Sequence, residues 1–256
     1  MCSSDLAELD LAPAHVDIGK LASAFMTDPE GQSLVDYVKA ACIDLLSAES
    51  AVSHPPRDVV IYGFGRIGRL VMRLLVEKAG GGQNLVPRAV VLRPPKDPLK
   101  DLHKRASLMR RDSIHGPFKG TIRVDAEHQA IICNGNAIRF IYATDPGAID
   151  YTVYGIQDAL IVDSTGAWRD TDGLGRHLTS KGVSKILLTT SGKGEMKNIV
   201  SGVNSHTIEA DDQLVAAASC TTNAIVPVLK AINDRFGIVH GHMETRSEEH
   251  TSELQS

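Results

Sequence analysis

The stretch "DVVIYGFGRIGRLVMRLLVEK" limits the possible folds of this chain more than any other segment does. In it, a short apolar run leads into Gly63-x-Gly65-x-x-Gly68, and a segment with helically spaced apolar residues follows. The first glycine permits a tight turn, the second lets the backbone approach a pyrophosphate, and the third lets a helix pack closely on a strand. The helix N-terminus then offers amide donors to the phosphates. This order predicts a Rossmann-type dinucleotide-binding site.

Short apolar runs continue to alternate with helical segments after this motif. The runs "RAVVL", "ALIVD", "KILLT" and "LVAAA" are continuous, which is typical of strands that are buried on both faces of a parallel sheet. The segment from Thr121 to Tyr142 instead has an antiparallel pattern, in which Asn134-Gly135 is a favoured hairpin turn. We therefore expect an α/β fold with a doubly wound, mostly parallel sheet and an antiparallel insertion.

Composition limits the class of partner. The 256 residues carry a net charge of −4, so no excess of basic side chains favours nucleic acid. No apolar run reaches the roughly 18 residues that cross a bilayer, so we expect no membrane partner. The four cysteines are scattered without a CxxC pair, which argues against a metal site or a disulfide framework. We expect a reducing compartment, the cytoplasm.

One cysteine has surroundings that suit chemistry. Cys220 ends the apolar run "LVAAAS" and begins the helical pattern "TTNAIVPVLKAI", so it lies where a helix N-terminus stabilises a thiolate. A lone cysteine is more often a buried structural residue. Here, however, it is flanked by hydroxyl and amide side chains, namely Ser219, Thr221, Thr222 and Asn223. We therefore expect a nucleophilic cysteine in a polar pocket.

Six segments together resemble the phosphorylating glyceraldehyde-3-phosphate dehydrogenases. They are "GFGRIGR", "RRDSIHG", "NGNAI", "DSTG", "SGVN" and "ASCTTN", and they occur in the order and spacing of that family. The similarity covers roughly residues 58–245, and "SCTTN" together with "GFGRIGR" is highly specific. The helical lead-in and Arg93 are similar to an N-terminally extended bacterial branch. The chain thus resembles a fragment of such an enzyme.

The resemblance implies a reaction and the residues that perform it. Cys220 matches the nucleophile that attacks the aldehyde of glyceraldehyde 3-phosphate to give a thiohemiacetal. Oxidation by NAD or NADP leaves a thioester, from which inorganic phosphate releases 1,3-bisphosphoglycerate. Ser219 and Thr221 match residues that hold the substrate or inorganic phosphate. The family is typically tetrameric, so we expect a homotetrameric parent protein. The positions that match cofactor contacts are Gly63, Gly65, Arg66, Ile67, Gly68, Arg93, Thr144, Ser164, Thr165, Gly166 and Thr189.

The choice of cofactor depends on Arg93. NAD-binding folds carry an acid at the end of the second strand, where it binds the ribose 2′-hydroxyl. This chain has Arg93 at that position, and an arginine can pair with the 2′-phosphate of NADP or remain a solvated surface residue. NAD and NADP both stay open.

The general base is the main departure from the family. The family places a histidine 27 residues after the nucleophile, and Ser247 occupies that position here. His240 and His242 alternate along an expected strand, and we expect them on an exposed face rather than as a metal pair. We therefore expect no appreciable turnover from this chain. Two alternatives remain: an erythrose-4-phosphate dehydrogenase, and a nucleotide-binding or regulatory homologue without catalysis.

The expected domain organisation follows from these assignments. Residues 7–56 form a helical N-terminal extension, residues 57–218 an NAD(P)-binding domain, and residues 219–245 the start of a truncated catalytic domain. Back-translation of residues 1–6 and 246–256 gives complementary strands of one oligonucleotide that resembles a sequencing adapter. We therefore expect both ends to be sequencing artefacts.

Overall fold

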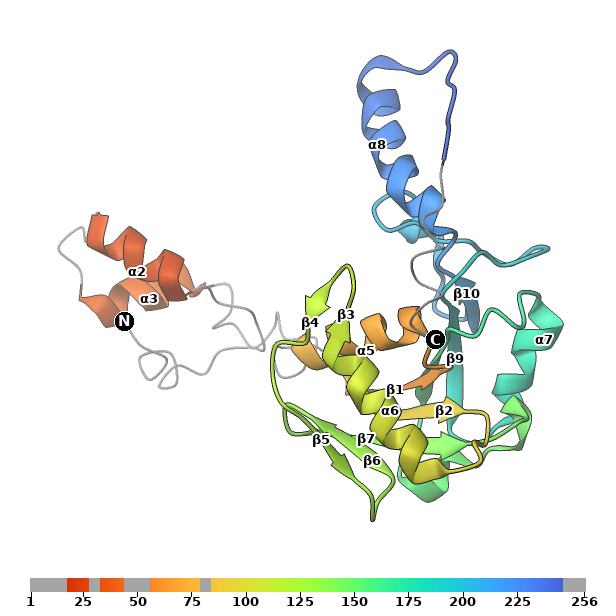
Figure 1. The fold of residues 1–256 in the computed structure, drawn as a ribbon. Helices are drawn as coiled ribbons and strands as arrows, with labels where there is room; N and C mark the ends of the chain where they lie inside the picture. Colours follow the sequence, from red (N-terminus) through yellow and green to blue (C-terminus); the bar gives the residue numbers. More distant parts are fainter. Residues whose placement is uncertain (1–17, 28–32, 44–55, 79–83, 246–256) are drawn as a thin grey trace. The chain divides into compact units, whose positions relative to one another are not determined.

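The computed structural model describes residues 18–27, 33–43, 56–78 and 84–245 of the chain. It divides into two compact units, one comprising residues 1–56 with 78–85 and the other residues 57–77 with 86–256 (Figure 1). The first unit contains the helices α2 (Ile18–Thr27) and α3 (Leu34–Ala41), which lie within the residues expected to form a helical extension. The Ser33 hydroxyl caps α3 by accepting the Asp36 N–H at 3.2 Å.

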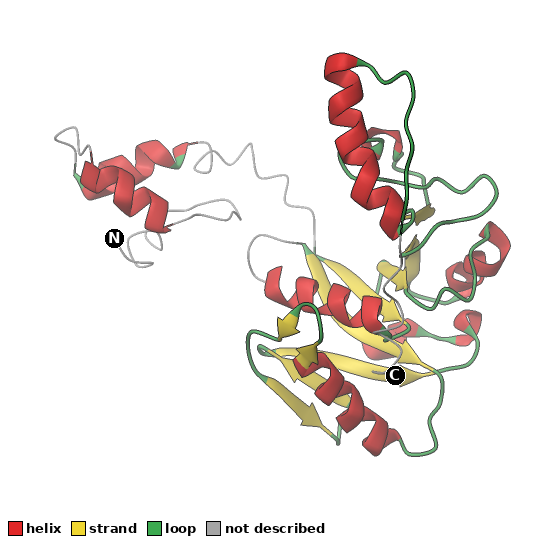
Figure 2. Cartoon of the chain, turned by 45° about the horizontal axis from the view of Figure 1, so that its top comes forward, coloured by secondary structure: helices red, strands yellow, loops and turns green. Residues whose placement is uncertain are grey.

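The second unit is built on an eight-stranded sheet with the order β10-β9-β8-β1-β2-β7-β6-β5 (Figure 2). Its parallel pairs are β1–β8, β8–β9, β9–β10 and β2–β7, whereas β5–β6 and β6–β7 are antiparallel. The strands are β1 (Arg57–Tyr62), β2 (Leu85–Leu92), β5 (Ile122–Asp125), β6 (Ala130–Cys133), β7 (Asn136–Tyr142), β8 (Ala159–Asp163), β9 (Val183–Leu188) and β10 (Leu214–Ala216). This arrangement confirms the predicted mostly parallel α/β sheet with an antiparallel insertion.

The remaining elements connect or cover these strands. In both views α5 (Arg66–Lys78) and α6 (Pro98–Arg110) lie on the same face of the sheet (Figures 1 and 2). A two-stranded ladder, β3 (Arg111–Asp112) with β4 (Gly116–Pro117), follows α6. The other helices are α7 (Thr171–Gly175), α8 (Cys220–Phe236) and the 3₁₀ segments η1 (Pro146–Ala148), η2 (Tyr151–Tyr154), η3 (Arg176–Thr179) and η4 (Ser205–Thr207).

Alternation along β1 explains why the sheet has a core on each face. Val60 and Tyr62 belong to a buried cluster that also includes Leu174 of α7 and Tyr151 of η2. Ile61 points the other way, where a methyl group on Gly68 of α5 would lie 3.1 Å from its Cγ2 atom. Because both faces are covered, the strand reads as a continuous apolar run, and complete burial of Ile61 contributes about 1.5–3 kcal/mol.

Two turns show where local sequence does and does not set the backbone. Asn134 and Gly135 connect β6 to β7 with φ values of 46° and 84°, as the hairpin prediction requires. The predicted strand "LVAAA" is shorter than expected, because β10 ends at Ala216. Ala218 adopts φ 58°, a left-handed conformation that an extended strand excludes.

The β3–β4 turn is tied to the start of α5 by one carboxylate. Asp112 accepts hydrogen bonds from Arg66 Nη2 at 3.0 Å and from the N–H groups of Ile114 and His115 at 3.0 and 2.9 Å. Burial acts to raise the pKa of Asp112, but these hydrogen bonds together outweigh it and hold the pKa well below its usual range. Ionised Asp112 therefore stabilises the fold.

We predict that Gly68→Ala destabilises the domain by about 1–3 kcal/mol, as overpacking does in other cores. The new Cβ atom would lie 2.3 Å from the Gly63 carbonyl oxygen, so helix or strand must shift. Urea unfolding measures the free energy of unfolding. Gly65→Ala is the matched control, because its Cβ would meet no atom within 4 Å. An equal loss in both variants would contradict the close-packing role of Gly68.

We predict that Asp112→Asn lowers the free energy of unfolding by about 1–3 kcal/mol at pH 7, because the partly buried hydrogen bonds to Asp112 lose a charged acceptor. A folded-state pKa below the unfolded value of about 3.9 stabilises the fold above that pH, and the contribution is lost as the pH falls further. The difference between wild type and variant therefore shrinks below about pH 4. Urea unfolding from pH 7 to pH 3 checks this, with the exposed Asp211→Asn as control. A difference that stays constant over this range would rule out the role of the carboxylate charge.

Candidate dinucleotide and thiol site

The predicted site residues follow the carboxyl ends of successive strands. In an open α/β sheet, ligands bind in the crevice outside these ends, where the strand order reverses. Here β2 lies on one side of β1 and β8 on the other, so the reversal is at β1. The residues that follow the strands are Gly63 after β1, Arg93 after β2, Thr144 after β7, Ser164 after β8, Thr189 after β9 and Cys220 after β10.

One cavity of about 370 Å³ opens at this edge. Four of the predicted cofactor residues line it together: Gly63, Arg93, Thr144 and Thr165. The lining also includes residues that the sequence did not single out, namely Tyr62, Val91, Leu92, Arg105, Ala143, Ala167 and Trp168. The lining thus combines apolar residues with a few polar groups, as small-molecule sites do.

The glycine loop has the geometry that a phosphate group needs. Gly63 has φ 90°, and its N–H donates to the Val91 carbonyl oxygen at 2.9 Å, which joins the turn to β2. A Cβ atom on Gly63 would lie 2.7 Å from Thr165 Cγ2, so no side chain fits there. A Cβ atom on Gly65 would meet nothing within 4 Å, which leaves room beside the first turn of α5. The loop therefore fits a dinucleotide whose phosphates face the amides of a 13-residue helix.

Two predicted contacts of this loop point elsewhere. The Arg66 guanidinium donates to Asp112 and, at 3.3 Å, to Ser113 Oγ, so its side chain faces the β3–β4 turn. The Ile67 side chain is 50% exposed. Neither residue is part of the cavity lining.

A buried contact between Asp163 and His177 positions the loop that follows β8. Asp163 and His177 are both 0% exposed, and His177 Nε2 lies 3.1 Å from Asp163 Oδ2. The other carboxylate oxygen accepts the Thr165 N–H at 2.8 Å and the Thr165 hydroxyl at 2.7 Å. Thr165 is thereby fixed in the cavity wall. The buried Ser164 hydroxyl has no hydrogen-bond partner among the described residues, and Gly166 continues the loop with φ 66°.

Cys220 is the first residue of α8, and its turn is held by its neighbours. The Ser219 hydroxyl caps the helix by accepting the Thr222 N–H at 3.0 Å. Asn223 Nδ2 donates to the carbonyl oxygens of Ala217 and Ser219 at 2.6 and 3.0 Å, on either side of the left-handed Ala218. Such a strained backbone persists only where its surroundings fix it.

Cys220 also differs from the other cysteines that the structure describes. It is exposed, whereas Cys42 and Cys133 are buried. Burial raises the pKa of the Cys133 thiol to about 12, so that group stays protonated. Cys220 is therefore the accessible thiol of the described part of the chain, and Thr221 follows it on the same helix.

The expected strand around His240 and His242 is wrong. Residues 237–245 form irregular chain after α8, and both histidines are exposed there. His242 Nε2 lies 3.3 Å from Glu244 Oε1, which is also exposed. Ser247, at the family's histidine position, lies outside the described residues.

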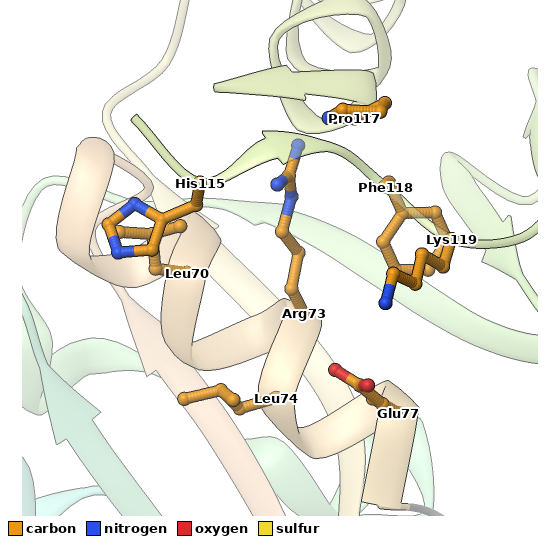
Figure 3. Close-up of a pocket in the computed structure, with 8 residues that line it drawn as sticks. All are labelled: Leu70, Arg73, Leu74, Glu77, His115, Pro117, Phe118 and Lys119. Carbon is orange, nitrogen blue, oxygen red and sulfur yellow. The ribbon is translucent and has the colours of Figure 1, made fainter. Parts of the chain in front are cut away.

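A second cavity of about 300 Å³ has none of the predicted residues (Figure 3). It lies between α5, through Leu70 and Leu74, and the segment of β4 and Phe118. Arg73 spans it and donates to the Met109 and Gly116 carbonyl oxygens, so this arginine stabilises the fold.

No described helix combines the length and apolar character that crossing a bilayer requires.

Comparisons with known proteins agree with this geometry. Residues 57–171 match the family described as "Glyceraldehyde 3-phosphate dehydrogenase, NAD binding domain". Residues 219–254 match "Glyceraldehyde 3-phosphate dehydrogenase, C-terminal domain". This second match includes most of the tail that we expect to derive from an adapter, and that expectation stays a prediction.

Individual relatives give the same result. The chain is 54% identical over 240 residues to a glyceraldehyde-3-phosphate dehydrogenase-like protein of Pseudomonas aeruginosa. This alignment covers 94% of this chain and 52% of the relative. A glyceraldehyde-3-phosphate dehydrogenase of Aspergillus oryzae is 39% identical over 187 residues, and one of Thermotoga maritima is 33% identical over 187 residues. Each alignment covers 73% of this chain, and they cover 51% and 52% of the two relatives. The alignment with the Pseudomonas aeruginosa protein is long enough to include most of the helical N-terminal extension.

The chain spans about half the length of the curated relatives it matches. The predicted resemblance is confirmed by both family matches and by these relatives. The chain therefore belongs to the glyceraldehyde-3-phosphate dehydrogenase family and carries its NAD-binding domain.

Proposed function

We propose that the full-length protein is a phosphorylating glyceraldehyde-3-phosphate dehydrogenase that uses Cys220 as its nucleophile. The observation that carries this proposal is the cavity in which Gly63, Arg93, Thr144 and Thr165 meet beside the open space at Gly65. NAD or NADP, when bound there, supplies the hydride acceptor for the oxidation. The relatives' names support glyceraldehyde 3-phosphate as the substrate. Inorganic phosphate is the second substrate in this proposal.

The chain's own residues divide the remaining work. In this proposal Cys220 Sγ attacks the aldehyde carbon and forms a thiohemiacetal, and oxidation converts it to a thioester that phosphate cleaves. The hydroxyls of Ser219 and Thr221 bind the phosphate groups. The exposed position of Cys220 and the polar cap of α8 support these roles. The parent protein works as a homotetramer in the cytoplasm.

One observation favours a second candidate, a nucleotide-binding homologue without catalysis. Within the described residues, Cys220 forms no hydrogen bond with a histidine that would remove its proton. The catalytic proposal therefore includes a base from elsewhere in the full-length protein. The two candidates differ in turnover and agree in dinucleotide binding.

For the catalytic proposal we predict that Cys220→Ser in the full-length protein lowers phosphate-dependent NAD(P)H formation at least about 10³-fold, because a serine hydroxyl is a far weaker nucleophile. Steady-state absorbance at 340 nm measures the rate, and dinucleotide affinity serves as the control for folding. Wild-type protein that binds the dinucleotide and shows no turnover would instead establish the non-catalytic homologue.

For the cofactor we predict that Arg93→Asp weakens NADP binding at least about tenfold more than NAD binding, because the new carboxylate repels a 2′-phosphate and accepts a 2′-hydroxyl. Titration of each dinucleotide against tryptophan fluorescence gives the two dissociation constants. An unchanged ratio of these constants would show that Arg93 does not contact this part of the cofactor.

A further inference from the structure

The cofactor cavity contains a second arginine that the family resemblance does not assign. Arg105 comes from the middle of α6, yet it lines the same cavity as Arg93 and Gly63. No lining residue of this cavity is acidic, so the carboxylate that NAD sites offer to the ribose 2′-hydroxyl is missing from it. The cavity lining therefore has two cationic groups and no acid, although Arg105 is paired with Asp101, which lies outside the lining.

The aspartates around this cavity already have partners. Asp145 pairs with Arg176 at 2.8 Å, and Asp163 is bound by His177 and Thr165. Arg93 is exposed and forms no ion pair within the described ranges. A lining with the unpaired Arg93, a second arginine and no acidic residue favours a ligand that brings a dianionic phosphate rather than a hydroxyl.

Arg105 is fixed before any ligand arrives. Its Nε donates to both oxygens of Asp101, at 3.2 and 3.4 Å, and its Nη1 donates to the Phe64 carbonyl oxygen at 3.5 Å. Phe64 lies between Gly63 and Gly65, so this guanidinium sits against the glycine loop. Its Nη2 has no protein partner in the part of the chain that the structure describes, which leaves two N–H donors free. The side chain is 24% exposed.

We propose that Arg105 and Arg93 together bind the ribose 2′-phosphate of NADP, and that this pair makes the domain select NADP over NAD. Arg105 acts as the fixed donor and Arg93 as the mobile one. Because Asp101 and the glycine loop already order Arg105, this side chain loses little conformational entropy when the ligand binds. The inference rests on the proposed dinucleotide site and adds to it the phosphate that distinguishes the two cofactors.

Calorimetric titration of the 256-residue chain with NADP, NAD, 2′,5′-ADP and 5′-ADP tests this inference. The wild type should bind NADP at least about tenfold more tightly than NAD, and 2′,5′-ADP more tightly than 5′-ADP. Arg105→Gln should weaken NADP and 2′,5′-ADP about tenfold and leave NAD and 5′-ADP within about twofold. Lys104→Gln removes the same charge from an exposed neighbour on α6 and should leave all four affinities unchanged.

Two further variants distinguish the loss of a phosphate contact from a folding defect. Arg105→Lys keeps the charge but loses the fork that Asp101 orients, so it should lose part of the NADP preference. Asp101→Asn should reduce the same preference without removing a positive charge.

Equal losses for NAD and NADP in Arg105→Gln would overturn the inference, because Arg105 would then only support the loop. NAD binding without NADP preference in the wild type would overturn the inference alone. Binding of no dinucleotide would overturn the proposed function as well.

Discussion

A single buried carboxylate holds together the edge of the sheet on which the candidate site depends. Asp163 is 0% exposed, and one of its oxygens binds His177 while the other binds the amide and hydroxyl of Thr165. Its backbone oxygen accepts the Thr189 N–H at 3.0 Å, which connects the ends of β8 and β9. A buried charge is costly without such partners. The Asp163 carboxylate therefore stabilises this loop, and the loop in turn supplies the hydrogen bonds that the buried carboxylate needs.

The aromatic side chains around His177 extend this arrangement into the cavity wall. Tyr62 and Trp168 contact the imidazole edge-on, with ring centroids 4.6 and 6.0 Å away, and both line the cavity. Tyr62 is also the β1 partner of Asp163 in the sheet register. Strand pairing, the buried Asp163–His177 contact and aromatic packing therefore all act on one loop. This convergence explains how residues distant in sequence form one ligand-sized space.

Much of the fold could be predicted because its signals are local. Continuous apolar runs marked the parallel strands, Asn134-Gly135 marked a hairpin, and the spacing of Gly63 and Gly68 marked the strand-to-helix turn. The left-handed backbone of Ala218 could not be predicted, because nothing in an alanine favours it and only tertiary contacts hold it. The same holds for Arg105, whose approach to the glycine loop depends on how α6 packs. The functional roles assigned to individual residues stay predictions.

The contrast among the cysteines has a consequence for oxidative damage. Oxidation to a sulfenic acid begins with an accessible thiolate, and a thiol kept protonated by burial reacts slowly. Cys133 lies in the core with its sulfur 3.8 Å from Met109 Sδ, whereas Cys220 is exposed on the first turn of α8. Among the cysteines that the structure describes, peroxide therefore reaches Cys220 first and leaves the sheet's interior reduced. The exposure that leaves this thiol open to a substrate leaves it open to oxidants as well.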